Sequence, residues 1–219
     1  MKKQIAIFAF FATFTLSAQN FQLHYDFVRE HATLTFEMFK VDKFGNTFTF
    51  TDFDFNGRDG MNQAYFELAR VFKTEKMPVG LHVEFNGGLG TFEDQEGGLD
   101  GYTLNNAYIF GANYGKSNAV WGFSTYAGYK LFENAGKANY QVTGTWYWNI
   151  ISDKLTFTGF ADFWSEKGLS GKNVFLTEPQ IWYHLNKSFS LGGEVEVSNN
   201  FAGFDEFKAR PTIALKWNI

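Results

Sequence analysis

The sequence contains no cysteine. This absence excludes disulfide bonds, and it also excludes a lipid anchor attached to an N-terminal cysteine. Long apolar runs are scarce: the run from Ile5 to Leu16 is too short to span a bilayer as a helix. No later stretch approaches the length of a membrane helix, and the mean hydropathy is slightly polar. A membrane protein built from helices is therefore not expected.

The first 18 residues have the order of a secretory signal peptide. Two lysines precede the apolar run, and the small residues Ser17 and Ala18 follow it. We therefore expect residues 1–18 to be removed and residues 19–219 to form one domain. Loss of the two lysines changes the formal net charge from −4 to −6. Such an acidic chain is not expected to bind nucleic acid.

Aromatic residues make up 20% of the chain, which is more than a soluble domain needs. Twelve segments after residue 18 alternate apolar and polar residues, and breaks rich in Gly, Asn, Asp and Lys separate them. In the first segment, Phe21, Leu23, Tyr25 and Phe27 alternate with residues that are mostly polar. Successive side chains of a strand point to opposite faces. Regular segments of this kind predict an all-β sandwich or barrel.

The breaks between these segments differ in length in a regular way. "KFGN", "GKSN", "SDK" and "NKS" are short, whereas "NGRDGMNQ", "GGLGTFEDQEGGLDG", "SEKGLSGKN" and "NNFAGFDE" are long. An even number of strands with short and long connections at opposite ends is typical of outer-membrane barrels. We therefore predict an all-β, antiparallel twelve-stranded transmembrane barrel in a Gram-negative outer membrane, with short periplasmic turns and longer extracellular loops. The apolar row of each strand would face lipid, and the polar row would line a narrow aqueous lumen.

Three segments depart from the simple pattern. "FTFTDFDF" keeps Asp52 on the same face as Phe48 and Phe50 unless a β-bulge intervenes. The stretch Ala64–Phe72 also fits helical spacing, so a short helix is an alternative to a strand. Pro179 lies inside the tenth segment, where it removes a ladder hydrogen bond. The conformation of Gly87–Gly101, the longest break, is left open.

The polar faces of the segments supply candidate lumen residues, most of them acidic. They are His24, Asp26, Glu37, His82, Glu84, Asp162, Glu178, Gln180, Glu194 and Glu196, with Lys208, Arg210 and Lys216 on the last strand. The first and last strands are neighbours in a closed barrel, so Asp26 is expected to face Lys208 or Arg210. The alternative is that these charges only pair with one another, and such pairs contribute little.

No constellation of residues indicates an enzyme or a metal site. The four histidines have no nucleophile motif near them, and no two of them lie close together on one strand. We therefore expect no enzymatic activity, no metal and no cofactor.

Six short stretches carry a family resemblance. They are "LTFE" (34–37), "FTFTDF" (48–53), "FTGFADF" (157–163), "LTEPQ" (176–180), "GGEVEVSNNF" (192–201) and "DEFKARPTIALKW" (205–217). Together they resemble the Tsx-like nucleoside-specific channel family of outer-membrane proteins. The resemblance implies a monomeric twelve-stranded barrel that conducts nucleosides passively. It also implies these lumen residues: Glu37, Asp52, Asp162, Glu178, Gln180 and Glu194.

The leading functional hypothesis is a passive channel for small polar solutes, with nucleosides first. Glu178, Gln180 and Asp162 suit the hydroxyls and amide-like groups of a nucleoside, and Phe160 or Trp182 would stack on its base. The alternative is a non-conducting barrel with a structural or adhesive role, whose lumen is closed by paired charges. A soluble lipocalin-like protein is a third hypothesis.

Overall fold

The computed structural model describes residues 17–56 and 60–219. Most of the predicted signal peptide lies outside these residues. The strands are β1 (Ser17–Asp26), β2 (His31–Asp42), β3 (Gly45–Phe55), β4 (Gln63–Phe72), β5 (Gly80–Glu93), β6 (Leu99–Ser117), β7 (Trp121–Phe132), β8 (Asn139–Ile151), β9 (Leu155–Ser165), β10 (Asn173–Thr177), β11 (Gln180–His184), β12 (Phe189–Asn199) and β13 (Lys208–Asn218). No helix in the described part of the chain is long and apolar enough to cross a membrane.

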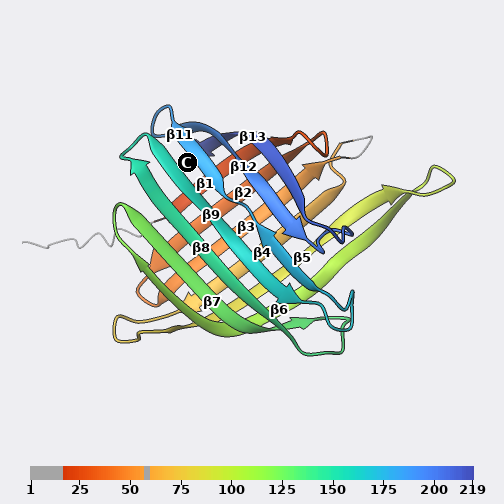
Figure 1. The fold of residues 1–219 in the computed structure, drawn as a ribbon, viewed down its shortest axis with the longest axis horizontal. Coiled ribbons are helices and arrows are strands. Elements are labelled where there is room, and N and C mark those ends of the chain that lie inside the picture. Colours follow the sequence, from red (N-terminus) through yellow and green to blue (C-terminus); the bar gives the residue numbers. More distant parts are fainter. Residues whose placement is uncertain (1–16, 57–59) are drawn as a thin grey trace, which may run out of the picture.

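The strands form one antiparallel sheet that closes on itself (Figure 1). Each strand pairs with its neighbours in sequence, and β1 pairs with β13 to close the ring. The short strands β10 and β11 both lie between β9 and β12, so together they form one strand of the barrel. The fold is therefore the predicted all-β, antiparallel twelve-stranded barrel.

The two faces of the wall differ in chemistry. In β1, Gln22, His24 and Asp26 are buried, whereas Leu23 and Tyr25 are 50% and 44% exposed. The same alternation continues around the ring, because residues opposite each other in a ladder share a face. The apolar row is thus on the outside and the polar row on the inside, as predicted.

Aromatic rings gather on the outer face near the chain termini. The rings of Phe21 and Trp217 stack with centroids 5.9 Å apart, and Phe189 stacks on the other side of Trp217 at 6.4 Å. Trp121 and Phe123 form a similar outer pair at 6.2 Å. Bands of this kind are typical of barrels at the membrane–water interface.

The longest break is a projecting hairpin. β5 and β6 continue past the rim of the barrel and are joined by a turn at residues 94–98. Figure 1 shows this yellow-green ribbon extending away from the barrel, so Gly87–Gly101 does not fold into the mouth. The ladder between β5 and β6 shifts register between Asn86 and Gly88, whereas β5 stays paired with β4 as far as Gly90. The glycines of this hairpin interrupt the alternation of apolar and polar residues, so the sequence did not indicate strands here.

The other irregular segments are also resolved. β3 pairs with β2 and β4 without a bulge, so Asp52 stays on the face of Phe48 and Phe50, and that face is the lumen. Ala64–Phe72 belongs to strand β4, and the helical alternative is wrong. Pro179 separates β10 from β11. It lacks an N–H, but its carbonyl still accepts a bond from the Val195 N–H at 3.1 Å, so the ladder stays in register.

We predict that a lysine is tolerated on the inner wall and not on the outer wall. Leu215 is 42% exposed on the outer face, whereas Thr145 faces inward opposite Ser124 and Phe160 and is also exposed. A lysine on the lipid side costs about 2–4 kcal/mol at the bilayer midplane. Leu215→Lys should therefore reduce the yield of heat-modifiable barrel in liposomes, and Thr145→Lys should not. Equal yields would argue against a lipid-facing outer row.

Candidate solute pathway in the barrel lumen

The register of the sheet places every predicted lumen residue on the inner wall. One row of directly opposed residues runs from Gln22 through Thr35 and Asp52 to Tyr65 on this side. The predicted residues that lie on this wall are His24, Asp26, Glu37, Asp52, His82, Glu84, Phe160, Asp162, Glu178, Gln180, Trp182, Glu194, Lys208, Arg210 and Lys216. The alternation of the strands thus holds at these positions, and contact of any of these residues with a solute stays a prediction.

Part of this inner wall is accessible to water. Asp52, Phe160, Glu178 and Glu194 point into the barrel but are only half-buried, and Thr145 is exposed. Inward side chains can keep accessible surface only where space remains between the walls. The lumen is therefore partly open, as expected for a barrel of intermediate size.

A packed cluster occupies the wall beside β1, β11 and β13. Trp182 is 1% exposed, and its indole N–H donates to Oε1 of Gln180 at 2.9 Å. Nζ of Lys216 lies 3.9 Å from the centroid of the indole ring. His24 meets the same ring edge-on, and its Nδ1 lies 3.0 Å from Oγ1 of Thr212. Trp182 therefore anchors the packing of this wall.

Three carboxylates approach one another across the lumen. Glu178, at the junction of β10 and β11, interacts electrostatically with Glu194 on β12 and Asp52 on β3. Around the ring, β13, β1 and β2 separate β12 from β3, so these side chains meet through the interior. Nε2 of Gln180 donates to Glu194 at 2.8 Å. These three carboxylates form an acidic cluster on the inner wall that offers acceptors to a solute in the lumen.

A second acidic group lies on the wall formed by β4, β5 and β7. The Tyr65 hydroxyl donates to Glu67 at 2.7 Å, and the Tyr126 hydroxyl donates to Glu84 at 3.2 Å. Nε2 of His82 lies 2.7 Å from Oε2 of Glu84, and its ring stacks on Tyr126 with centroids 3.8 Å apart. These contacts fix both carboxylates in place.

Lys130 is the cation among these acids. Its ammonium donates to Oε1 of Gln141 at 2.6 Å and interacts electrostatically with Glu67, Glu84 and Asp162. Oδ1 of Asp162 is buried and has no hydrogen-bond partner among the described residues. A buried acceptor of this kind can take a bond from water or from a solute. Within the described chain, no group of three or more His, Asp or Glu side chains is arranged to hold a metal.

An ion-pair chain lies at the end of the lumen opposite the termini. Nε of Arg29 donates to Asp26 at 2.6 Å, and its Nη2 lies 3.1 Å from Glu196. Arg210, only 2% exposed, donates from the other side to Glu196 and, at 3.1 Å, to Ser198. Burial lowers the pKa of Arg29, but the carboxylates of Glu196 and Asp26 raise it above the ordinary value overall. The four charges tie β1, β12 and β13 together.

The expected pairing of Asp26 with Lys208 or Arg210 is wrong. Asp26 lies opposite Thr212 and bonds Arg29, because the β1–β2 turn folds Arg29 back over the strand end. Lys208 instead hydrogen-bonds Glu206 at the rim, and this contact lowers the pKa of Glu206. Lys208 therefore belongs to the mouth of the barrel.

Several inner-wall residues escaped the sequence reasoning. Phe50 and Tyr65 form an aromatic contact inside the barrel, with centroids 5.9 Å apart, and Glu67 lies beside them. The strand that carries Tyr65 and Glu67 was ambiguous with a helix, so the faces of these two residues were not assigned. For Lys130, the alternation in "STYAGYKLF" (residues 124–132) would have been enough to place its side chain on the inner face. Arg29 had no such signal, because turn residues have no fixed face.

Solved structures share this architecture. The structure of the NanC porin matches with a TM-score of 0.60 and 10% identity, over 92% of this chain and 100% of that one. The KdgM porin matches with a TM-score of 0.52 and 10% identity, over 93% of this chain and 99% of that one. A KdgM porin in complex with disordered oligogalacturonate matches at 0.51, with the same identity and the same coverage. At such identities the likeness establishes a porin-like fold.

Sequence comparison gives the family. No curated protein sequence matches the chain. A family model described as "Domain of unknown function (DUF5020)" matches residues 18–219. The nucleoside-specific part of the Tsx-like resemblance goes beyond these matches and stays a prediction. The chain belongs to the DUF5020 family, and it folds as a porin-like twelve-stranded β-barrel.

Proposed function

We propose that the protein is a passive, monomeric outer-membrane channel for small polar solutes, with nucleosides as the first candidates. The main supporting observation is the division of the wall into an exposed apolar outer row and a polar inner row that is buried or half-buried. The closed ladder leaves no sheet edge that a second subunit would have to cover. Its position in the bilayer would place the termini on the periplasmic side.

The charge of the lumen favours some solutes over others. Ten acids face inward: Asp26, Glu37, Asp52, Asp54, Glu67, Glu84, Asp162, Glu178, Glu194 and Glu196. In the described strands, four Lys and Arg residues do so: Lys130, Lys208, Arg210 and Lys216. Rings of like charge set ion preference in a narrow passage. An acidic polymer such as the oligogalacturonate in the KdgM complex would be repelled here, whereas neutral and cationic solutes would pass.

Nucleosides fit the accessible part of this wall. Phe160 is half-buried, and its carbonyl accepts the N–H of Glu178 at 3.1 Å, so the ring lies close to that carboxylate. Gln180 and Asp162 follow on the same wall. A base could stack on Phe160 while its amino group and sugar hydroxyls donate to these acceptors. Trp182 is less suitable for stacking, because Lys216 covers its ring.

The projecting hairpin favours a second candidate function. Leu89, Phe92 and Leu99 are 65%, 51% and 75% exposed on this ribbon. Exposed apolar side chains away from the membrane belt suit an adhesive or structural barrel. In that case the ion pairs of Arg29 and Arg210 would keep the mouth closed. Channel recordings separate the two candidates, because the structural barrel would not conduct.

The solute prediction is tested by liposome swelling. Liposomes that contain the purified barrel should admit adenosine and thymidine several-fold faster than digalacturonate, because the inner carboxylates repel the uronate. Phe160→Ala should slow the nucleosides and leave a small neutral sugar unchanged. If neither nucleoside enters faster than through empty liposomes while the neutral sugar does, the nucleoside assignment fails and the channel remains.

Ion selectivity provides a separate prediction. Replacing Asp52 and Glu178 by Asn and Gln removes two of the three carboxylates of the acidic cluster. The reversal potential under a salt gradient should then shift toward zero, because cation preference falls. The shift should shrink as salt rises and screens the charges. Glu206→Gln at the exposed rim is the matched control and should change it little. The same potential in both variants would show that the acidic cluster does not lie on the ion pathway.

A further inference from the structure

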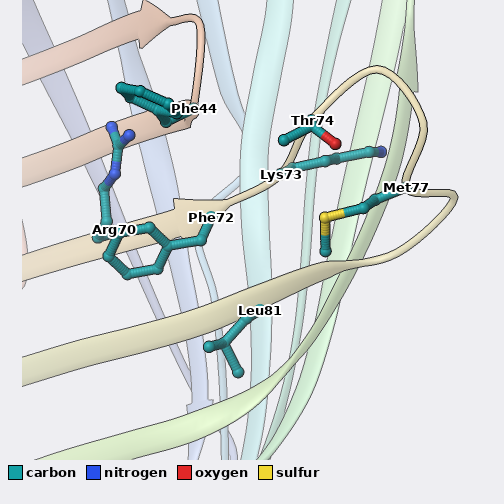
Figure 2. Close-up of a pocket in the computed structure, with 7 residues that line it drawn as sticks. All are labelled: Phe44, Arg70, Phe72, Lys73, Thr74, Met77 and Leu81. Carbon is teal, nitrogen blue, oxygen red and sulfur yellow. The ribbon is translucent and has the colours of Figure 1, made fainter.

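A pocket of about 460 Å³ opens on the outer surface of the barrel near the chain termini (Figure 2). Its walls are Phe44 of the β2–β3 turn, Phe72 of β4, Met77 of the β4–β5 loop and Leu81 of β5. Figure 2 shows Met77 reaching from the loop toward the strands that carry Phe72 and Leu81. All four side chains are apolar, and each is at least 40% exposed. The pocket is therefore an apolar recess on the surface.

The recess lies on the lipid side of the wall and not in the lumen. Phe72 and Leu81 are directly opposite each other in the β4–β5 ladder and share the outer face. Their neighbours Val71 and His82 are buried on the inner face. The turn and the loop hold together at the rim, since the Lys73 N–H donates to the Phe44 carbonyl at 2.8 Å. A solute in the lumen is thus separated from the recess by the sheet.

One cation of the recess is already neutralised. Both Nη atoms of Arg70 donate to the Asp42 carboxylate at 2.8 Å. The guanidinium carbon lies 5.3 Å from the centroid of the Phe72 ring, so Arg70 also forms part of the wall. The role of Arg70 is structural, because the Asp42 carboxylate neutralises the charge of the guanidinium and accepts its hydrogen bonds.

Three lysines belong to the turn and the loop that border the recess. Lys73 lines it directly, with Nζ 6.0 Å from the centroid of the Tyr114 ring. Lys43 precedes Phe44 in the turn, and Lys76 precedes Met77 in the loop. Glu75 is the one acid within the β4–β5 loop. The recess lies at the level where a barrel meets the lipid head groups. Its apolar walls suit an acyl chain, and the ammonium groups at its edge suit an anionic head group.

We propose that this recess binds an anionic phospholipid of the inner leaflet. One acyl chain would lie against Phe72, Met77 and Leu81, and the phosphate would contact Lys73 with Lys43 and Lys76 nearby. The proposal rests on the membrane placement given under the proposed function. It is independent of conduction, because the recess and the lumen lie on opposite faces of the sheet.

Native mass spectrometry of the full mature chain in mild detergent tests this site. Phosphatidylglycerol should bind at least fivefold more tightly than phosphatidylcholine with the same acyl chains. The variant Lys43→Gln, Lys73→Gln, Lys76→Gln should lose this preference. The control Lys154→Gln, Lys187→Gln changes lysines of two other turns on the same rim and should keep it. Leu81→Trp should weaken the binding of both lipids by filling the recess.

Three results would overturn the proposal. They are equal binding of the two lipids to the unmodified chain, an unchanged preference in the triple lysine variant, and a dimer that the recess variants abolish. The last result would make a second copy of the chain the occupant. Failure of the proposed function has a different signature: no channel current in a chain that still prefers phosphatidylglycerol.

Discussion

The ladder between β1 and β13 is the constraint on which the rest of the structure depends. It runs from Asn20 opposite Asn218 to Asp26 opposite Thr212 and turns an open sheet into a ring. In a bilayer every backbone donor and acceptor must be satisfied within the chain, and an open edge would fail this condition. Closure also fixes which face is inside, so one face of each strand meets lipid and the other meets the lumen.

Closure by twelve strands also brings side chains of distant strands together. Asp52 and Glu178 interact although four strands lie between theirs by the shorter way around the ring. A narrower barrel would be filled by such side chains, and a wider one would keep them apart. The half-buried carboxylates and the ion pairs of Arg29 and Arg210 with Glu196 are two results of the same crowding. The carboxylates line a water-accessible acidic passage, and the ion pairs join strands at the mouth of that passage.

The sequence was informative about faces and much less so about partners. The period of two in "FQLHYDF" is enough to place Phe21 outside and His24 inside, because a strand has only two faces. The partner of Asp26 was not predictable, since it depends on how the β1–β2 turn directs Arg29. The hairpin at Gly87–Gly101 was read as a break because its glycines interrupt the apolar pattern. The electrostatic interaction of Asp52 with Glu178 depends on the diameter of the barrel, which no local sequence pattern encodes.

Thiol accessibility tests the division of the wall most directly, because the chain has no cysteine and any introduced one is unique. Thr145→Cys and Val142→Cys lie three residues apart on β8, one facing inward and one facing outward with 44% exposure. In liposomes, a charged, membrane-impermeant thiol reagent should modify the cysteine at 145 quickly and the cysteine at 142 very slowly. In detergent-free urea both should react. Equal rates in liposomes, or faster reaction at 142, would contradict a water-filled lumen inside a lipid-facing wall.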